Sequence, residues 1–202
     1  MPADPWTTTP TLEGRHVTLR PLQREDREAL LAAFADGLEH VFYTVVPSAS
    51  TIDAWFGQLE REHAAGRALP FTVLDAQGRV SGVTRFMRVA RAHRRVEIGG
   101  TVYAARVQRT GLNTEAKRLL LTYAFETLGC HVVQLRTDWL NQRSRTAIER
   151  LGAKLDGVLR GHLVMPDGHI RDSVVYSIIA SEWPGVRARL DMLLAGRYSE
   201  QP

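Results

Sequence analysis

The stretch Gln108-Arg-Thr-Gly-Leu-Asn-Thr-Glu-Ala-Lys-Arg-Leu-Leu-Leu-Thr-Tyr-Ala-Phe-Glu-Thr-Leu-Gly129 decides how the rest of the chain is interpreted. From Glu115 onward, apolar residues recur at intervals of three and four, which predicts a helix over 115–128 with one buried face. Glu115 fits the positive N-terminal end of this helix, and Gly129 fits the position just after its last residue. The buried face would consist of Ala116, Leu119, Leu120, Tyr123, Ala124 and Leu128.

The residues before this helix, 108–114, are polar, contain a glycine and favour a turn. A loop that leads into a helix N-terminus presents backbone N–H groups that have no partner within the helix. This end of the helix therefore suits an anion such as a phosphate, and Arg109 adds a positive charge beside it. The same residues are equally compatible with a loop that binds no ligand.

Length and composition are those of an ordinary globular protein: 202 residues, 44% hydrophobic and 24% charged. We expect one domain over 1–202, with an N-terminal arm over 1–14 and a terminal helix over 182–197. The apolar runs are too short to span a membrane, and the N-terminus lacks the layout of a secretory signal. The single cysteine, Cys130, excludes an internal disulfide and fits a reducing compartment. These features predict a cytoplasmic protein that does not contact a membrane.

Periodicity and turn residues predict the order of the remaining elements. The expected strands cover 17–20, 71–74, 80–86, 95–103, 131–138, 154–165 and 169–179, and the other helices cover 23–34, 52–65 and 142–151. The strand–helix–strand unit over 95–138 implies one parallel pair, while the hairpins on either side imply antiparallel neighbours. The expected fold is therefore α/β (α+β), with a mixed, mostly antiparallel sheet of about seven strands flanked by helices.

The strand expected over 95–103 contains the pair Gly99-Gly100. Glycine inside a strand often marks a bulge or a place where another backbone or a ligand approaches closely. An ordinary bulge without a ligand would fit the same residues.

Several short motifs, in order along the chain, resemble one known family. Gln108-Arg-Thr-Gly111-Leu-Asn113 is similar to the pyrophosphate loop Gln/Arg-x-x-Gly-x-Gly/Ala of the GNAT superfamily of acyl-CoA-dependent N-acyltransferases, from which it departs at Asn113. The downstream motifs resemble the branch that contains the ribosomal-protein N-terminal acetyltransferases of RimJ/RimL type. They are Asn141-Gln-Arg-Ser144, Ile148-Glu-Arg-Leu-Gly-Ala153, Gly157-Val-Leu-Arg160 and Arg171-Asp-x3-Tyr-Ser-Ile178, and the resemblance extends from about Leu12 to Ile179.

The resemblance implies a GNAT-like fold whose sheet splays at its one parallel pair. It also implies an N-acetyltransferase that uses acetyl-CoA as co-substrate and needs no metal. The loop 108–114 would hold the pyrophosphate of CoA, and the gap between the strands 95–103 and 131–138 would hold the pantetheine arm. The implied donor-binding residues are Ile98, Gly99, Gly100, Thr101, Gln108, Arg109, Thr110, Gly111, Leu112, Asn113, Thr114, Asn141 and Ser144.

Direct acyl transfer requires a neutral amine, so a base must accept the proton of the ammonium form. The resemblance implies a carboxylate at the position of Glu97 for this role. An ion pair between Glu97 and a nearby arginine explains the residue equally well. Asp138, at the end of the next strand, is a second candidate, and Asp172 is a third.

The resemblance also implies that Ser144 protonates the leaving thiolate. This branch often lacks the tyrosine that has that role elsewhere, and no tyrosine occurs between Tyr123 and Tyr176. Without the resemblance, Asn141 is simply a capping residue and Ser144 a serine in the first helical turn.

The expected acceptor is a primary amine, either a peptide or protein N-terminus or a small molecule. Its pocket would lie between the segment 43–55 and the hairpin 163–170. Aromatic residues that could line it, or could equally belong to the core, are Phe42, Tyr43, Trp55 and Phe56.

The net charge is +4, and seven arginines fall between Arg85 and Arg109. This cluster supports an alternative function, a non-catalytic acyl-CoA-binding or nucleic-acid-associated module on the same fold. No zinc spacing, RNA-recognition motif or helix-turn-helix pattern accompanies the charge, so we do not expect a nucleic-acid partner. The strand 171–179 and the terminal helix could form a homodimer surface or complete the monomer core.

Overall fold

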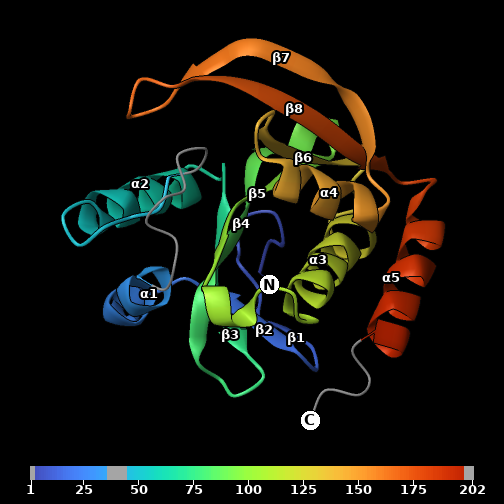
Figure 1. The fold of residues 1–202 in the computed structure, drawn as a ribbon. Coiled ribbons are helices and arrows are strands. Elements are labelled where there is room, and N and C mark those ends of the chain that lie inside the picture. Colours follow the sequence, from blue (N-terminus) through green and yellow to red (C-terminus); the bar gives the residue numbers. More distant parts are fainter. Residues whose placement is uncertain (1–2, 36–44, 198–202) are drawn as a thin grey trace.

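The computed structural model describes residues 3–35 and 45–197, which form one sheet with helices on both sides (Figure 1). The eight strands lie in the order β1-β2-β3-β4-β5-β6-β8-β7. They are β1 (Leu12–Glu13), β2 (Val17–Pro21), β3 (Leu69–Asp75), β4 (Val80–Ala90), β5 (Arg95–Tyr103), β6 (Val132–Asp138), β7 (Lys154–Val164) and β8 (Ile170–Ile179). The predicted mixed α/β sheet flanked by helices is thus confirmed.

The helices fall into two groups. On one side of the sheet lie α1 (Arg27–Phe34) and α2 (Ile52–Ala64), and on the other lie α3 (Leu112–Thr122), α4 (Gln142–Leu151) and α5 (Trp183–Arg197) (Figure 1). The short helices are η1 (Arg24–Asp26), η2 (Arg91–His93), η3 (Ala105–Val107) and the π-helical turn η4 (Tyr123–Thr127), which continues α3. In the part of the chain that the structure describes, no helix combines the length and the apolar character needed to cross a membrane.

The eighth strand, β1, is one that the sequence did not predict. It is two residues long, and Leu12 pairs with Leu19 of β2. A two-residue strand is too short to show alternation of apolar and polar side chains. Residues ahead of it also pack onto the protein, since Trp6 and Thr9 are buried.

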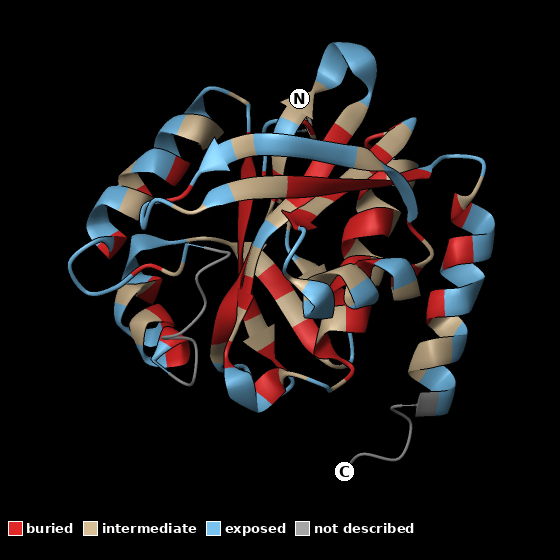
Figure 2. Cartoon of the chain, turned by 45° about the horizontal axis from the view of Figure 1, so that its top comes forward, coloured by how far each residue is buried: buried red, intermediate tan, exposed pale blue. Residues whose placement is uncertain are grey.

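The main hydrophobic core lies between the sheet and α3. Ala116, Leu120 and Ala124 on the predicted buried face have no exposed surface, and Leu119 and Tyr123 pack against the core partly buried. Figure 2 shows buried residues gathered on the sheet strands and on the sides of the helices that face them, whereas β7 is largely exposed. Cys130 belongs to this core, and burial raises the pKa of its thiol to about 12.

Strands β5 and β6 are the only parallel neighbours in the described residues. Their pairing runs from Arg95↔Val132 to Ile98↔Leu135 and then stops, so the two strands separate beyond Ile98. On its other edge β5 carries the predicted bulge. Val83 pairs with Val102 and Arg85 with Gly99, which leaves Thr84 opposite both Gly100 and Thr101.

Helix α3 begins at Leu112, three residues before the predicted start at Glu115. Its N-cap position is Gly111, which has no side chain to signal a cap. Glu115 lies in the first turn of α3, at the N-terminal end where the sequence predicted it. Its carboxylate accepts hydrogen bonds from the backbone N–H groups of Arg15 and His16, the first at 3.0 Å, and so fastens α3 to the segment before β2.

Candidate active site

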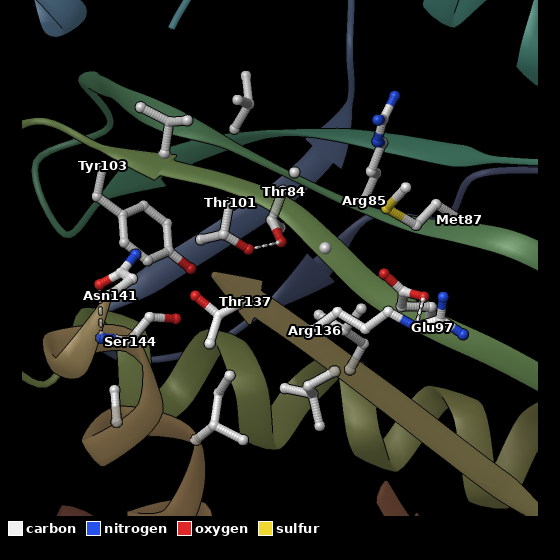
Figure 3. A pocket seen from close by; sticks show the side chains of 18 of the residues that line it. Thr84, Arg85, Met87, Glu97, Thr101, Tyr103, Arg136, Thr137, Asn141 and Ser144 are labelled. Atoms are coloured by element: carbon white, nitrogen blue, oxygen red, sulfur yellow. Dashed lines mark hydrogen bonds and ion pairs between the residues drawn. The ribbon is translucent and has the colours of Figure 1, made fainter. Parts of the chain in front are cut away.

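A cavity of about 930 Å³ opens where β5 and β6 separate. Its walls come from β4, β5, β6, α3, α4 and the β7–β8 hairpin. Figure 3 shows the labelled lining residues of β4, β5, β6 and the start of α4. The predicted site residues that line it are Glu97, Ile98, Gly99, Gly100, Thr101, Gln108, Arg109, Thr110, Asn113, Asn141 and Ser144. Most of the predicted donor site and two of the predicted catalytic groups therefore share one cavity.

Gly111, Leu112 and Thr114 are buried and lie outside the lining of the cavity. Gly111 packs closely against the segment before β2, because a Cβ atom there would lie 2.9 Å from the His16 side chain. The loop before it turns through Arg109, whose φ of 64° is a left-handed conformation. Asn113, the departure from the family motif, lies in the first turn of α3 and lines the cavity.

The bulge in β5 brings the strand backbone to the cavity surface. Gly100 has a φ of 56°, and a Cβ atom there would lie 2.8 Å from Nε of Arg85. A Cβ atom at Gly99 would lie 2.6 Å from Sδ of Met87. Gly100 therefore requires glycine for its conformation, whereas a side chain at Gly99 would have to displace the flexible side chain of Met87.

Asn141 caps α4 as predicted, since its Oδ1 accepts a hydrogen bond of 3.0 Å from the backbone N–H of Ser144. Ser144 lines the cavity, and apart from hydrogen bonds within the helix only its backbone N–H, which donates to Asn141, is hydrogen-bonded among the described residues. A free hydroxyl at this position is available to a ligand.

Replacing Asn141 by alanine is expected to lower the free energy of unfolding by about 1 kcal/mol, the usual value of an N-cap. Thermal unfolding of the variant measures this loss, with Gln142→Ala, in the next and exposed position, as control. A variant as stable as the parent would show that the cap contributes nothing to α4.

Glu97 is buried and lies between two arginines. Nη1 of Arg88 is 2.8 Å from both carboxylate oxygens, and Nε of Arg136 is 3.1 Å from Oε2. Arg88 itself has a φ of 48°, at a register shift of β4 against β5. The ion pair that the sequence left open is therefore present, and Glu97 also lines the cavity, where a base could act.

Asp138 lies outside the lining of the cavity. Its Oδ2 is 2.9 Å from Nε2 of His169, and its Oδ1 accepts a hydrogen bond of 2.8 Å from the backbone N–H of Leu140. These contacts hold the β7–β8 turn and the end of β6 together. Asp172 accepts a hydrogen bond of 2.7 Å from the backbone N–H of Gly161 and is likewise absent from the lining.

Of the aromatic residues predicted near the acceptor, Trp55 lines the cavity. Phe56 is buried in a second core cluster with Leu30 and Phe34. Phe42 and Tyr43 lie outside the described residues.

The family description "Acetyltransferase (GNAT) domain" matches residues 16–154. The chain belongs to the GNAT acetyltransferase family. Among curated GNAT relatives, YdaF of Bacillus subtilis (strain 168), provisionally named a ribosomal N-acetyltransferase, is 28% identical over 85% of this chain and 96% of its own. Spermidine N(1)-acetyltransferase of Escherichia coli (strain K12) is 24% identical over 83% of this chain and 88% of its own.

Solved structures agree with this membership. A protein from T. thermophilus, provisionally described as an acetyltransferase, is 38% identical with a TM-score of 0.80, covering 91% of this chain and 96% of its own. RimJ of Mycobacterium smegmatis, solved in complex with CoA-disulfide, shares the GNAT fold with a TM-score of 0.77, 24% identity and coverage of 94% and 96%.

The sequence did not point to Lys117, which the GNAT cavity contains. Lys117 is 6% exposed, and its Nζ donates a hydrogen bond of 2.9 Å to Oγ1 of Thr101 at the bulge. Thr101 Oγ1 in turn lies 2.8 Å from Oγ1 of Thr84. No carboxylate of the described residues pairs with Lys117, and burial lowers the pKa of its amine to about 7.

Tyr103, at the end of β5, is a second unforeseen residue. Its hydroxyl is buried and has no hydrogen-bond partner among the described residues, and burial raises its pKa well above the ordinary value. Figure 3 shows its ring on the side of the cavity where Asn141 and Ser144 lie. The sequence prediction considered tyrosines only after Tyr123, and Tyr103 lies before it in the chain.

Proposed function

We propose that this protein transfers an acetyl group from acetyl-CoA directly to a primary amine. The acceptor would be a peptide or protein N-terminus or a small molecule, in keeping with the names of the ribosomal and spermidine relatives. The observation that carries the proposal is the continuity of one cavity from the loop 108–114, past the bulge, to Glu97. A donor entering at the loop and an acceptor entering near Glu97 would meet between the separated strands.

The donor end of the cavity suits the CoA pyrophosphate. Its features are the N-terminus of α3 and the guanidinium groups of Arg109, Arg143 and Arg150, which all line the cavity. Nε of Arg150 is buried without a hydrogen-bond partner among the described residues, so it can donate to a phosphate. The unpaired edge of β5 beyond Ile98 offers backbone groups to the pantetheine amides.

Proton transfer would involve one group that accepts a proton from the amine and another that donates a proton to the sulfur. The incoming amine forms the new C–N bond as the C–S bond breaks, so the ammonium proton must leave and the thiolate must gain one. Ser144, whose hydroxyl is available in the lining of the cavity, is our candidate for protonating the sulfur. Glu97 is our candidate for the base, and Asp138 is a weaker one because it does not line the cavity.

Binding of acetyl-CoA is the first test. Calorimetry should show saturable binding by the parent protein, and Arg109→Glu should weaken it by about tenfold or more, because it reverses one charge-assisted contact. Arg189→Glu, at an exposed position of α5 outside the cavity, is the matched control and should bind as the parent does. A parent protein that does not bind acetyl-CoA would refute the proposal.

Turnover is the second test, because it separates an enzyme from a module that only binds acyl-CoA. Thiol release should depend on an added amine. Acetyl-CoA binding without amine-dependent release would favour the non-catalytic alternative. We also propose a cytoplasmic location, supported by the buried free thiol of Cys130, and a homodimer. The strand 171–179, predicted as one possible dimer surface, is β8, whose two edges pair with β6 and β7, so we place the proposed interface on the exposed apolar residues of β7, such as Leu155 and Val164.

A further inference from the structure

The end of the cavity away from the donor loop is strongly basic. Figure 3 shows Glu97 and Arg136 at the opposite end of β5 from Tyr103 and Asn141. Arg88 of β4, Arg136 of β6 and Arg171 of β8 all line this end, and we call them the arginine cluster. They come from three separate strands, so the fold itself gathers their charges at one place.

Glu97 is the only carboxylate among the described residues that line the cavity. It contacts Arg88 and Arg136, and Asp138, outside the lining, also attracts Arg171, so two negative charges act on the three positive charges of the arginine cluster. Arg171 has no carboxylate within 4.0 Å among the described residues, and its Nε donates to Oγ of Ser173 at 3.1 Å. The cluster therefore retains an excess of positive charge.

The arginines of the cluster are partly buried, so their excess positive charge is unfavourable unless an anion binds beside them. Arg136 has a side-chain exposure of 18%, and burial lowers the pKa of Arg171 despite the attraction of Asp138 and Glu97. Burial also lowers the pKa of His162, which shares the cavity, and the charges of Arg136, Arg88 and Arg171 lower it further. A positive group brought to this end would meet the same repulsion.

The guanidinium group presents parallel N–H donors that match a carboxylate in a two-point contact. Arg171 commits only its Nε within the described residues, which leaves its terminal nitrogens for a ligand. The donor phosphates do not explain the cluster. The pyrophosphate site at α3 has its own arginines, and the bulge at Gly99–Thr101 lies between the two ends.

We infer that the acceptor is a primary amine whose side chain carries a carboxylate, and that the arginine cluster, Arg171 above all, binds this side-chain carboxylate. The inference rests on the proposed acetyl transfer and specifies its substrate class. A free acidic amino acid and a peptide with an acidic first residue both present this chemistry. A polyamine does not, because each further ammonium group is repelled by the cluster.

Amine-dependent thiol release can test this with pairs of acceptors that differ in one charge. The free amino acids are glutamate and glutamine, the amidated tripeptides are Glu-Ala-Ala and Gln-Ala-Ala, and spermidine is the cationic acceptor. We expect kcat/KM to be about tenfold or more higher for the acidic member of at least one pair, and lowest for spermidine. The pair with the larger ratio identifies the source of the carboxylate.

The variant Arg171→Gln should bring the ratio of the acidic to the neutral acceptor close to one while acetyl-CoA binding stays unchanged. Arg171→Lys should restore part of the ratio, because it keeps the charge but loses the two-point contact. Arg160→Gln, at an exposed position of β7 outside the cavity, is the control and should keep the ratio of the parent.

The outcomes separate this inference from the proposed function. Release that is equally efficient with neutral or cationic amines overturns the acceptor class and leaves acetyl transfer standing. An equal loss with all acceptors in Arg171→Gln overturns the role of Arg171, because a purely structural residue would behave in this way. If none of the amines causes thiol release although acetyl-CoA binds, both the proposed transfer and the acceptor class are overturned.

Discussion

Replacing Lys117 by methionine is expected to raise the free energy of unfolding at pH 7 by about 3 kcal/mol. The amine of Lys117 is buried, and its one hydrogen bond is to Thr101. Burial lowers its pKa from 10.5 to about 7, so the folded protein binds this proton much more weakly than the unfolded chain does. Methionine removes that cost, and the lost hydrogen bond to Thr101 offsets only part of the gain.

The pH dependence has a definite sign. Between about pH 7 and 10.5 the unfolded chain holds the proton of Lys117 and the folded protein has released it. The free energy of unfolding rises with pH wherever the unfolded state binds more protons. Lys117 therefore makes the free energy of unfolding of the parent protein increase as the pH goes from 7 to 10.5. The advantage of Lys117→Met should therefore be largest at or below pH 7 and shrink towards pH 10.

Urea unfolding at pH 7 and pH 9.5 measures both effects. Lys154→Met is the matched control, because Lys154 is 75% exposed and its pair with Glu182 lies at the surface. That control should change stability by less than about 1 kcal/mol at either pH.

A Lys117→Met variant that is less stable than its parent at pH 7 would show that the ammonium group is well compensated in the fold. Thiol release by the same variant tests whether the amine serves the reaction.

The spacing of apolar residues was enough to predict the sheet and most helix positions. The faces of α3 and the limits of α4 follow directly from periodicity and from the cap at Asn141. The start of α3 did not follow, because its N-cap is Gly111 and because the carboxylate of Glu115 is used by the backbone of His16, 99 residues away in the sequence. Contacts over such a separation leave no local pattern.

In the candidate site too, features with a local sequence pattern were predicted, and features that depend on distant contacts were not. Gly99 and Gly100 signalled the bulge because a strand seldom contains two adjacent glycines. Lys117 gave no such signal, since lysine on a helix usually reaches solvent and its burial depends on the packing of α3 under β5. One trace was available: Lys117 is spaced three, four and seven residues from Leu120, Leu121 and Ala124, which places it on an apolar face.

The arginine cluster could not be predicted for a topological reason. Arg88, Arg136 and Arg171 are far apart in the sequence and lie on β4, β6 and β8. Only the strand order β4-β5-β6-β8 brings them around Glu97. The sequence showed an excess of arginine near Glu97, but it could not show which charges share a cavity.

Replacing Glu97 by glutamine is expected to lower the rate of acetyl transfer by about a hundredfold, the lower range for loss of a general base. It should also lower the free energy of unfolding by about 2 kcal/mol. The buried carboxylate is the counter-charge of Arg88 and Arg136, and glutamine leaves both guanidinium groups without it. The stability loss is discounted because the Arg88 side chain is 40% exposed.

A double variant separates the two roles of Glu97. Arg88→Leu combined with Glu97→Gln removes one positive charge along with the negative one, so it should recover much of the stability. If Glu97 accepts the proton of the amine, the rate stays low in the double variant although its stability has recovered. If Glu97 is only a counter-ion, stability and rate recover together, and the base must be sought elsewhere in the cavity.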